Sequence, residues 1–138
     1  MKSHLLSVAM LVFSIPAISN AAPGGHDFSP QFNACYAAAN GGTASKAACL
    51  ADELDRQNRA AEESHEQTSK LLAGTEKKQF ADDFVEWKKN ILLDCSLQAD
   101  NRTVPIEREN ARKSCLIERT IGRLNGDDLI RQNKTSAK

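Results

Sequence analysis

The stretch FADDFVEWKKNILLDC, residues 80–95, decides the fold of this chain. Its apolar residues recur every three or four positions, which places them on one face of an α-helix. They are Phe80, Phe84, Trp87, Ile91 and Cys95. Because such a face has to be buried, the stretch predicts a helix whose aromatic side chains belong to the core.

Helix signals extend outward from this stretch on both sides, and no segment shows the two-residue alternation of a β-strand. The four expected helices cover residues 30–39, 43 or 45 to 73, 75–99 and 105–125. Ser29 is the expected N-cap of the first helix and Thr75 that of the third, while Gly74 provides a left-handed stop for the second. The sequence therefore predicts an all-α fold, a small bundle of two helical hairpins.

The second expected helix has an incomplete apolar face. The best candidate face consists of Ala47, Ala51, Leu54, Asn58, Ala61, His65, Thr68 and Leu72. Its ends are apolar and its middle is not. Two interpretations remain: the helix packs through small or polar residues, or it projects partly into water.

The first residues have the layout of a secretory signal. Lys2 precedes an apolar run over 5–18, and Ser19-Asn20-Ala21 forms a small-x-small cleavage site. We expect residues 1–21 to be a signal peptide that directs the chain to the periplasm or the medium. We further expect a short flexible N-terminus over 22–27, a helical domain over 28–126 and a polar, disordered tail over 127–138.

The four cysteines indicate disulfide bonds. An even number of cysteines in an exported chain is typical of disulfides, and their spacing lacks the close pairs of a zinc site. Residues equidistant from a turn face each other in an antiparallel helical hairpin. Cys35 and Cys49 are symmetric about the Asn-Gly-Gly turn, and Cys95 and Cys115 about Pro105. The sequence therefore favours the pairs Cys35–Cys49 and Cys95–Cys115, each contributing about 3 kcal/mol in the chain-entropy model.

Composition and motifs argue against several functions. Loss of Lys2 with the signal leaves a net charge of −1, which does not favour a nucleic-acid partner. No catalytic, phosphate-binding or calcium-binding motif occurs, and outside the signal only His26 and His65 remain. We therefore expect a protein that is not an enzyme and has no cofactor, no bound metal and no transmembrane segment in its mature part.

The charges are unevenly distributed. The second expected helix is acidic, whereas residues 101–138 carry a net charge of +4. Such an asymmetry steers a charged partner, but it also occurs where paired helices neutralise each other. Both interpretations remain open at this point.

The spacing of several residues resembles the lysozyme-inhibitor LprI-type family of small exported bacterial proteins. Trp87 lies eight residues before Cys95, and Cys115 is followed by Thr120 at plus five and Arg123 at plus eight. Leu54 follows Cys49 where the family has a leucine. The chain departs from the family at four polar positions, which here are Asp55, Asn58, Phe84 and Ile91.

The resemblance implies an exported helical protein that binds and inhibits a lysozyme or another cell-wall hydrolase. Many lysozymes are strongly basic, so we expect an acidic contact face on the second helix. Its residues would be Asp52, Asp55, Glu62 and Glu66. Two alternatives are a periplasmic immunity protein against a delivered toxin, and a helper that binds peptidoglycan or an envelope assembly through residues 102–134.

Overall fold

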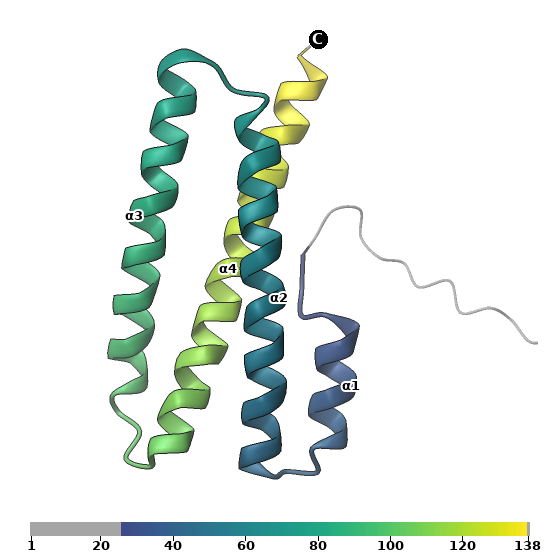
Figure 1. Cartoon of the computed structure of the whole chain (residues 1–138), viewed down its shortest axis with the longest axis vertical. Helices are drawn as coiled ribbons and strands as arrows, with labels where there is room; N and C mark the ends of the chain where they lie inside the picture. The colour runs from purple at the N-terminus through teal and green to yellow at the C-terminus, as the bar shows by residue number, and fades with distance from the viewer. Residues whose placement is uncertain (1–25, 138) are drawn as a thin grey trace, which may run out of the picture.

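The computed structural model describes residues 26–137 and contains four α-helices in this part of the chain (Figure 1). The expected signal peptide lies outside the described residues. The helices are α1 (Pro30–Ala38), α2 (Thr43–Ser69), α3 (Gly74–Ala99) and α4 (Pro105–Ser136). The predicted all-α class is confirmed.

The helices form two antiparallel hairpins, α1 with α2 and α3 with α4 (Figure 1). Helix α4 runs obliquely between α2 and α3 and packs against both, most extensively against α2. Helices α2 and α3 touch each other at few positions. The bundle is therefore built around α4, and α3 depends on α4 for most of its packing.

Both predicted disulfides are present. Cys35–Cys49 joins α1 to α2 with a Cα–Cα distance of 5.8 Å, and Cys95–Cys115 joins α3 to α4 with a distance of 5.5 Å. Each pair lies in its own apolar cluster, and Leu54 packs against both clusters. Each half of the core thus contains a covalent cross-link between neighbouring helices.

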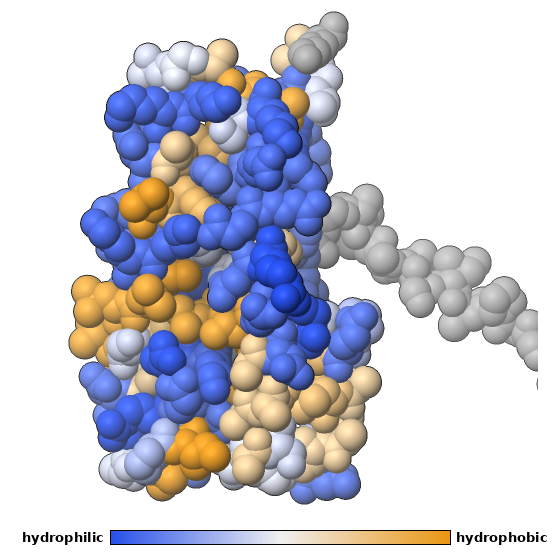
Figure 2. Space-filling model, in the orientation of Figure 1, coloured by the Kyte–Doolittle hydropathy of each residue, from blue (hydrophilic) through white to orange (hydrophobic). Residues whose placement is uncertain are grey.

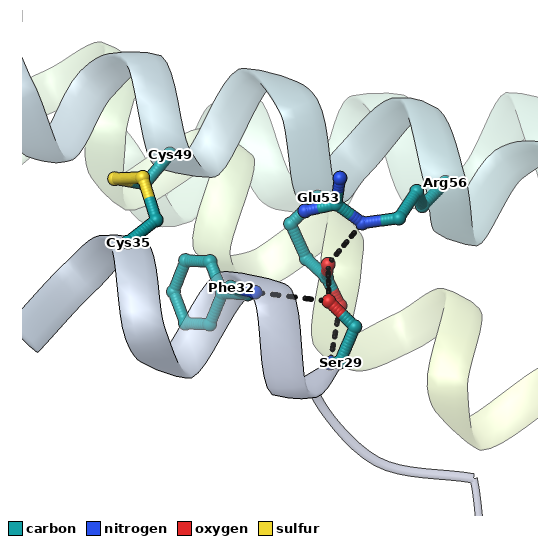
Figure 3. The surroundings of a disulfide bond; sticks show 6 residues. All are labelled: Ser29, Phe32, Cys35, Cys49, Glu53 and Arg56. Atoms are coloured by element: carbon teal, nitrogen blue, oxygen red, sulfur yellow. Dashed lines mark hydrogen bonds and ion pairs between the residues drawn. A yellow bond between two sulfur atoms is a disulfide. The ribbon is translucent and has the colours of Figure 1, made fainter.

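A buried carboxylate provides the second attachment of α1 to α2. Glu53 is fully buried and accepts hydrogen bonds from the backbone N–H of Ser29 at 2.8 Å and from the Ser29 hydroxyl (Figure 3). The Arg56 Nε and the Gln57 side-chain amide donate to the same carboxylate at 3.0 and 2.8 Å. Ser29 also caps α1 by accepting from the Phe32 N–H, as predicted. A buried charge is tolerated here because several donors surround it.

These contacts change the ionisation of Glu53. Burial by itself raises the pKa of a carboxyl group, but the hydrogen bonds from Ser29, Gln57 and Arg56 favour the charged form and outweigh it. The net result is a pKa below the usual value of 4.5. Glu53 is therefore ionised in the folded protein at neutral pH.

The buried face of α2 is rotated relative to the predicted face. Ala51 and Asn58 are exposed, contrary to expectation. The buried positions of α2 are Cys49, Leu50, Glu53, Gln57, Ala61, Ser64 and Thr68. The interpretation of α2 as a helix that packs through small and polar residues is thus correct. The predicted rotation was wrong because Glu53, Gln57 and Ser64 are buried by hydrogen bonds to residues outside α2, which the periodicity of α2 does not reveal.

Helix α4 continues to Ser136, so the predictions of a helix end at Asn125-Gly126 and of a disordered tail were wrong. The reason is polar contact with α2. The Arg131 Nη1 donates to the Ser64 hydroxyl at 2.7 Å and to the Thr68 hydroxyl at 2.8 Å. Asp127 is buried and accepts from the Ser64 hydroxyl at 3.3 Å. Lys134 forms an ion pair with Glu76 of α3 at 2.8 Å.

The described part of the predicted flexible N-terminus is also attached to α4. The His26 backbone N–H donates to the Asn125 side-chain oxygen at 2.6 Å, and the His26 Nε2 lies 3.0 Å from an Asp128 carboxylate oxygen.

At the other end of α4, Pro105 begins the helix as predicted.

Between α2 and α3, Gly74 has a φ of +53°, the left-handed conformation expected of it. Helix α3 nevertheless begins at Gly74 itself, with Ala73 as its N-cap, so the prediction of Thr75 as the cap was wrong.

Replacing the buried carboxylate tests its role in fixing α1. Glu53→Gln keeps the shape but turns an acceptor oxygen into a donor that faces Ser29 and Arg56. We expect the free energy of unfolding to fall by about 2–4 kcal/mol. Urea unfolding followed by far-UV circular dichroism measures this free energy of unfolding. The exposed Glu63→Gln is the matched control. Because the fold lowers the pKa of Glu53, its contribution is present above pH 4.5 and lost as the pH falls below it. Equal stability of both variants would contradict this role.

Removing Arg131 tests the attachment of the C-terminal half of α4. Arg131→Ala deletes the hydrogen bonds to Ser64 and Thr68 and leaves their hydroxyls without this donor. We expect a loss of about 1–3 kcal/mol, and faster amide hydrogen exchange over residues 127–136. The neighbouring exposed residue provides the control variant, Gln132→Ala. Unchanged exchange in Arg131→Ala would show that these contacts do not order the segment.

Candidate functional site

The aromatic stretch of residues 80–95 lies in α3, and its rings face α2 and α4. Phe80, Phe84 and Cys95 are buried, as predicted, whereas Trp87 and Ile91 are only half-buried. The His65 ring of α2 stacks on Phe84 and Phe80, with ring centroids 4.0 and 4.7 Å apart. A histidine that the sequence placed on the inner face of α2 thus serves as an aromatic partner for α3.

Arg123 of α4 covers the same aromatic group. Its guanidinium lies 5.0 Å from the ring centroid of Phe80, 5.4 Å from Phe84 and 5.7 Å from Trp87. These distances permit cation–π attraction. The Arg123 Nε also lies 3.0 Å from the buried Asp127 carboxylate, in an ion pair not aligned as a hydrogen bond. Arg123 therefore links the polar contacts of α4 to the aromatic face of α3.

The environment of His65 disfavours its charged form. Burial lowers the pKa below the usual 6.5, and the nearby positive charge of Arg123 lowers it further, while Asp127 and Glu62 oppose the shift. The His65 Nδ1 is buried and has no hydrogen-bond partner. A neutral, stacked imidazole is what this geometry stabilises.

Three of the positions that carried the family resemblance lie close together, and the fourth, Thr120, is buried in α4. Trp87 and Arg123 are in contact, and Leu54 lines the same cavity as Trp87. Thr120 is fully buried, and its hydroxyl donates to the Leu116 carbonyl at 2.8 Å. All four positions contribute to packing at the junction of α2, α3 and α4.

The four predicted acidic contact residues are all exposed on α2, and Glu62 lies on the flank towards α3. Three of them form ion pairs. Asp55 pairs with Arg59 at 2.6 Å, Glu66 with Lys70 at 2.8 Å, and Glu62 with Lys88 of α3 at 2.9 Å. Asp52 is in none of the ion pairs of the described residues. The predicted acidic residues are thus exposed on α2 among basic partners, so the outer face of α2 carries mixed charge.

Several basic residues of α4 are also paired. Arg112 makes two hydrogen bonds with Glu109, at 2.8 and 3.0 Å, and these help to lower the pKa of the glutamate. Arg131 pairs with Asp128, and Lys134 with Glu76. Ion pairing with nearby acids thus offsets part of the positive charge locally at the predicted basic end.

A cavity of about 360 Å³ lies between α2 and α3, with α4 as its floor. We call it the α2–α3 groove. Its apolar lining consists of Leu54, Ala61, Phe84, Trp87, Ile91, Leu92 and Leu116. Its polar lining consists of Asn58, Glu62, Lys88 and Arg112. Cavities of this size and apolar character commonly bind small molecules or a partner's side chain.

The groove was missed in the sequence analysis because three helices contribute to it. One signal was present: Leu92, which lines the groove, lies outside the predicted apolar face of α3, as do Leu93 and Leu97, which do not line it. The three leucines are 53%, 61% and 62% exposed. Figure 2 shows an apolar band across the lower half of α3 that extends towards α2. Exposed apolar surface of this kind often marks an interaction site.

Over residues 26–137 no group of three His, Cys, Asp or Glu side chains could hold a metal ion. Both cysteine pairs are oxidised, and His65 faces aromatic rings instead of a nucleophile. None of the described helices is long and apolar enough to span a bilayer.

These features define the class: an all-α, disulfide-linked bundle with an open groove. Comparison with known proteins finds no matching family model and no match among curated proteins or solved structures. The resemblance to the LprI-type family therefore rests on the residue positions alone.

The half-buried His65 makes stability depend on pH. Because the fold lowers the pKa of His65, the unfolded chain binds a proton more readily below pH 6.5. We expect the free energy of unfolding to fall as the pH drops from 7.5 to 5.5. A His65→Gln variant, neutral at both pH values, should show a smaller drop in guanidinium titrations. An unchanged pH dependence in His65→Gln would contradict the assignment.

Proposed function

We propose that this protein is an exported, non-enzymatic binding protein that inhibits a lysozyme-type cell-wall hydrolase. The observation that carries the proposal is a long helix, α2, whose outer face presents exposed carboxylates on a rigid support. The resemblance in cysteine, tryptophan, threonine and arginine positions supports the choice of target.

The contact surface in this proposal is the outer face of α2. Its ion pairs are solvent-exposed, and such pairs contribute little to stability, so a partner's lysine or arginine can replace Arg59 or Lys70 at small cost. The disulfide Cys35–Cys49 and the Glu53 contacts hold α2 in place before binding. A preformed surface loses less conformational entropy on association.

Binding by surface contact needs no catalytic arrangement of side chains, and none supports an enzymatic function among the described residues. The predicted export of the chain agrees with the presence of two disulfides, which form in oxidising compartments. The periplasm is where a bacterial protein would meet a cell-wall hydrolase.

An inhibition titration against a basic lysozyme tests the proposal. We expect the oxidised mature protein to inhibit, and the inhibition to weaken between 50 and 300 mM salt by about tenfold, as screening reduces charge attraction. The double variant Asp52→Lys, Glu66→Lys should weaken inhibition roughly tenfold at low salt.

The matched control is Asp82→Lys with Asp83→Lys, which reverses two exposed charges on α3 and should leave inhibition unchanged. Full lysozyme activity in the presence of a large excess of the protein at both salt concentrations would refute the proposed function.

A further inference from the structure

The α2–α3 groove has a depth and lining that an interhelical contact alone does not require. Its volume of about 360 Å³ lies within the range of small-molecule sites. Trp87 and Phe84 form one wall, with ring centroids 5.4 Å apart. Leu54 and Leu116 lie opposite on α2 and α4. An apolar chain placed here would bury part of its surface against these side chains.

The charged residues of the groove have an excess of positive charge. Lys88 and Arg112 are cationic and Glu62 is the single carboxylate, which leaves a net charge of +1 among the lining residues. Glu109 uses only two of the five N–H groups of Arg112, and Glu62 accepts one of the three of Lys88. Donors therefore remain on both cations without loss of their present partners.

From this arrangement we propose that the α2–α3 groove binds an anionic amphiphile, a molecule with a medium-length apolar chain and a carboxylate head. The chain lies against Trp87, Phe84 and Leu116, and the head accepts hydrogen bonds from Lys88 and Arg112. Glu62 disfavours a second negative charge, so a head with a single charge fits best. This inference is independent of the proposed inhibition of a hydrolase.

Intrinsic fluorescence measures the binding directly, because Trp87 is the single tryptophan of the chain. The probes are decanoate, decanol and decyltrimethylammonium, each used below the concentration at which it aggregates. They share a chain length and differ in the charge of the head. We expect a saturable change with decanoate and an at least fivefold weaker response to the other two. No saturable change with decanoate overturns the proposal, and equal responses to all three overturn the assignment of an anionic head.

Two pairs of variants locate the site. Asn58→Phe places a ring at the exposed edge of the groove and should weaken decanoate binding at least tenfold, while Asn90→Phe, on the opposite flank of α3, should not. Lys88→Gln should weaken binding about two- to fivefold, and its exposed neighbour Lys89→Gln should have no effect. Circular dichroism verifies that each variant is folded. Equal affinities within both pairs would overturn the assignment of this groove.

Discussion

Polar groups buried along α2 each require a partner, and this constraint shapes the whole bundle. Glu53 finds its donors in Ser29, Arg56 and Gln57, which attaches α1 and the segment before it. About three and four turns of helix further along, Ser64 and Thr68 find theirs in Arg131 of α4. A more apolar α2 would impose no such selection, because apolar contacts are not directional. Hydrogen bonds thus specify which helices lie on α2 and at what level.

The need of buried polar groups for partners also explains why α3 is held in a different way from α1 and α4. Its attachments are the disulfide Cys95–Cys115 near one end, the ion pair of Glu76 with Lys134 near the other, and the contact of its aromatic face with His65 and Arg123. Between α2 and α3 the contacts are sparse, and Glu62 with Lys88 is an exposed ion pair between them. The groove exists because α3 is anchored mainly to α4 and not pressed against α2.

Ionisation follows from the same packing. Glu53 is surrounded by donors and stays charged, whereas His65 lies between rings and near Arg123 and stays neutral. Acidification therefore affects the two halves of the bundle in separate ranges, first near the histidine and, at lower pH, near the carboxylate. The exposed charged residues differ from Glu53 and His65, because their partners can be exchanged with little effect on the fold.

Local signals in the sequence determined the helices and their pairing. Periodicity, Ser29, Pro105 and the positions of the four cysteines depend on neighbouring residues or on symmetry about a turn, so they are visible without a fold. The rotation of α2, the extension of α4 and the groove were decided only by tertiary structure. Arg131 and Ser64 are 67 residues apart, and nothing near either residue indicates the other. Hydrogen-bond partners so distant in sequence allow polar residues to be buried in the core. A prediction based on apolar periodicity assigns the same residues to the solvent-exposed surface.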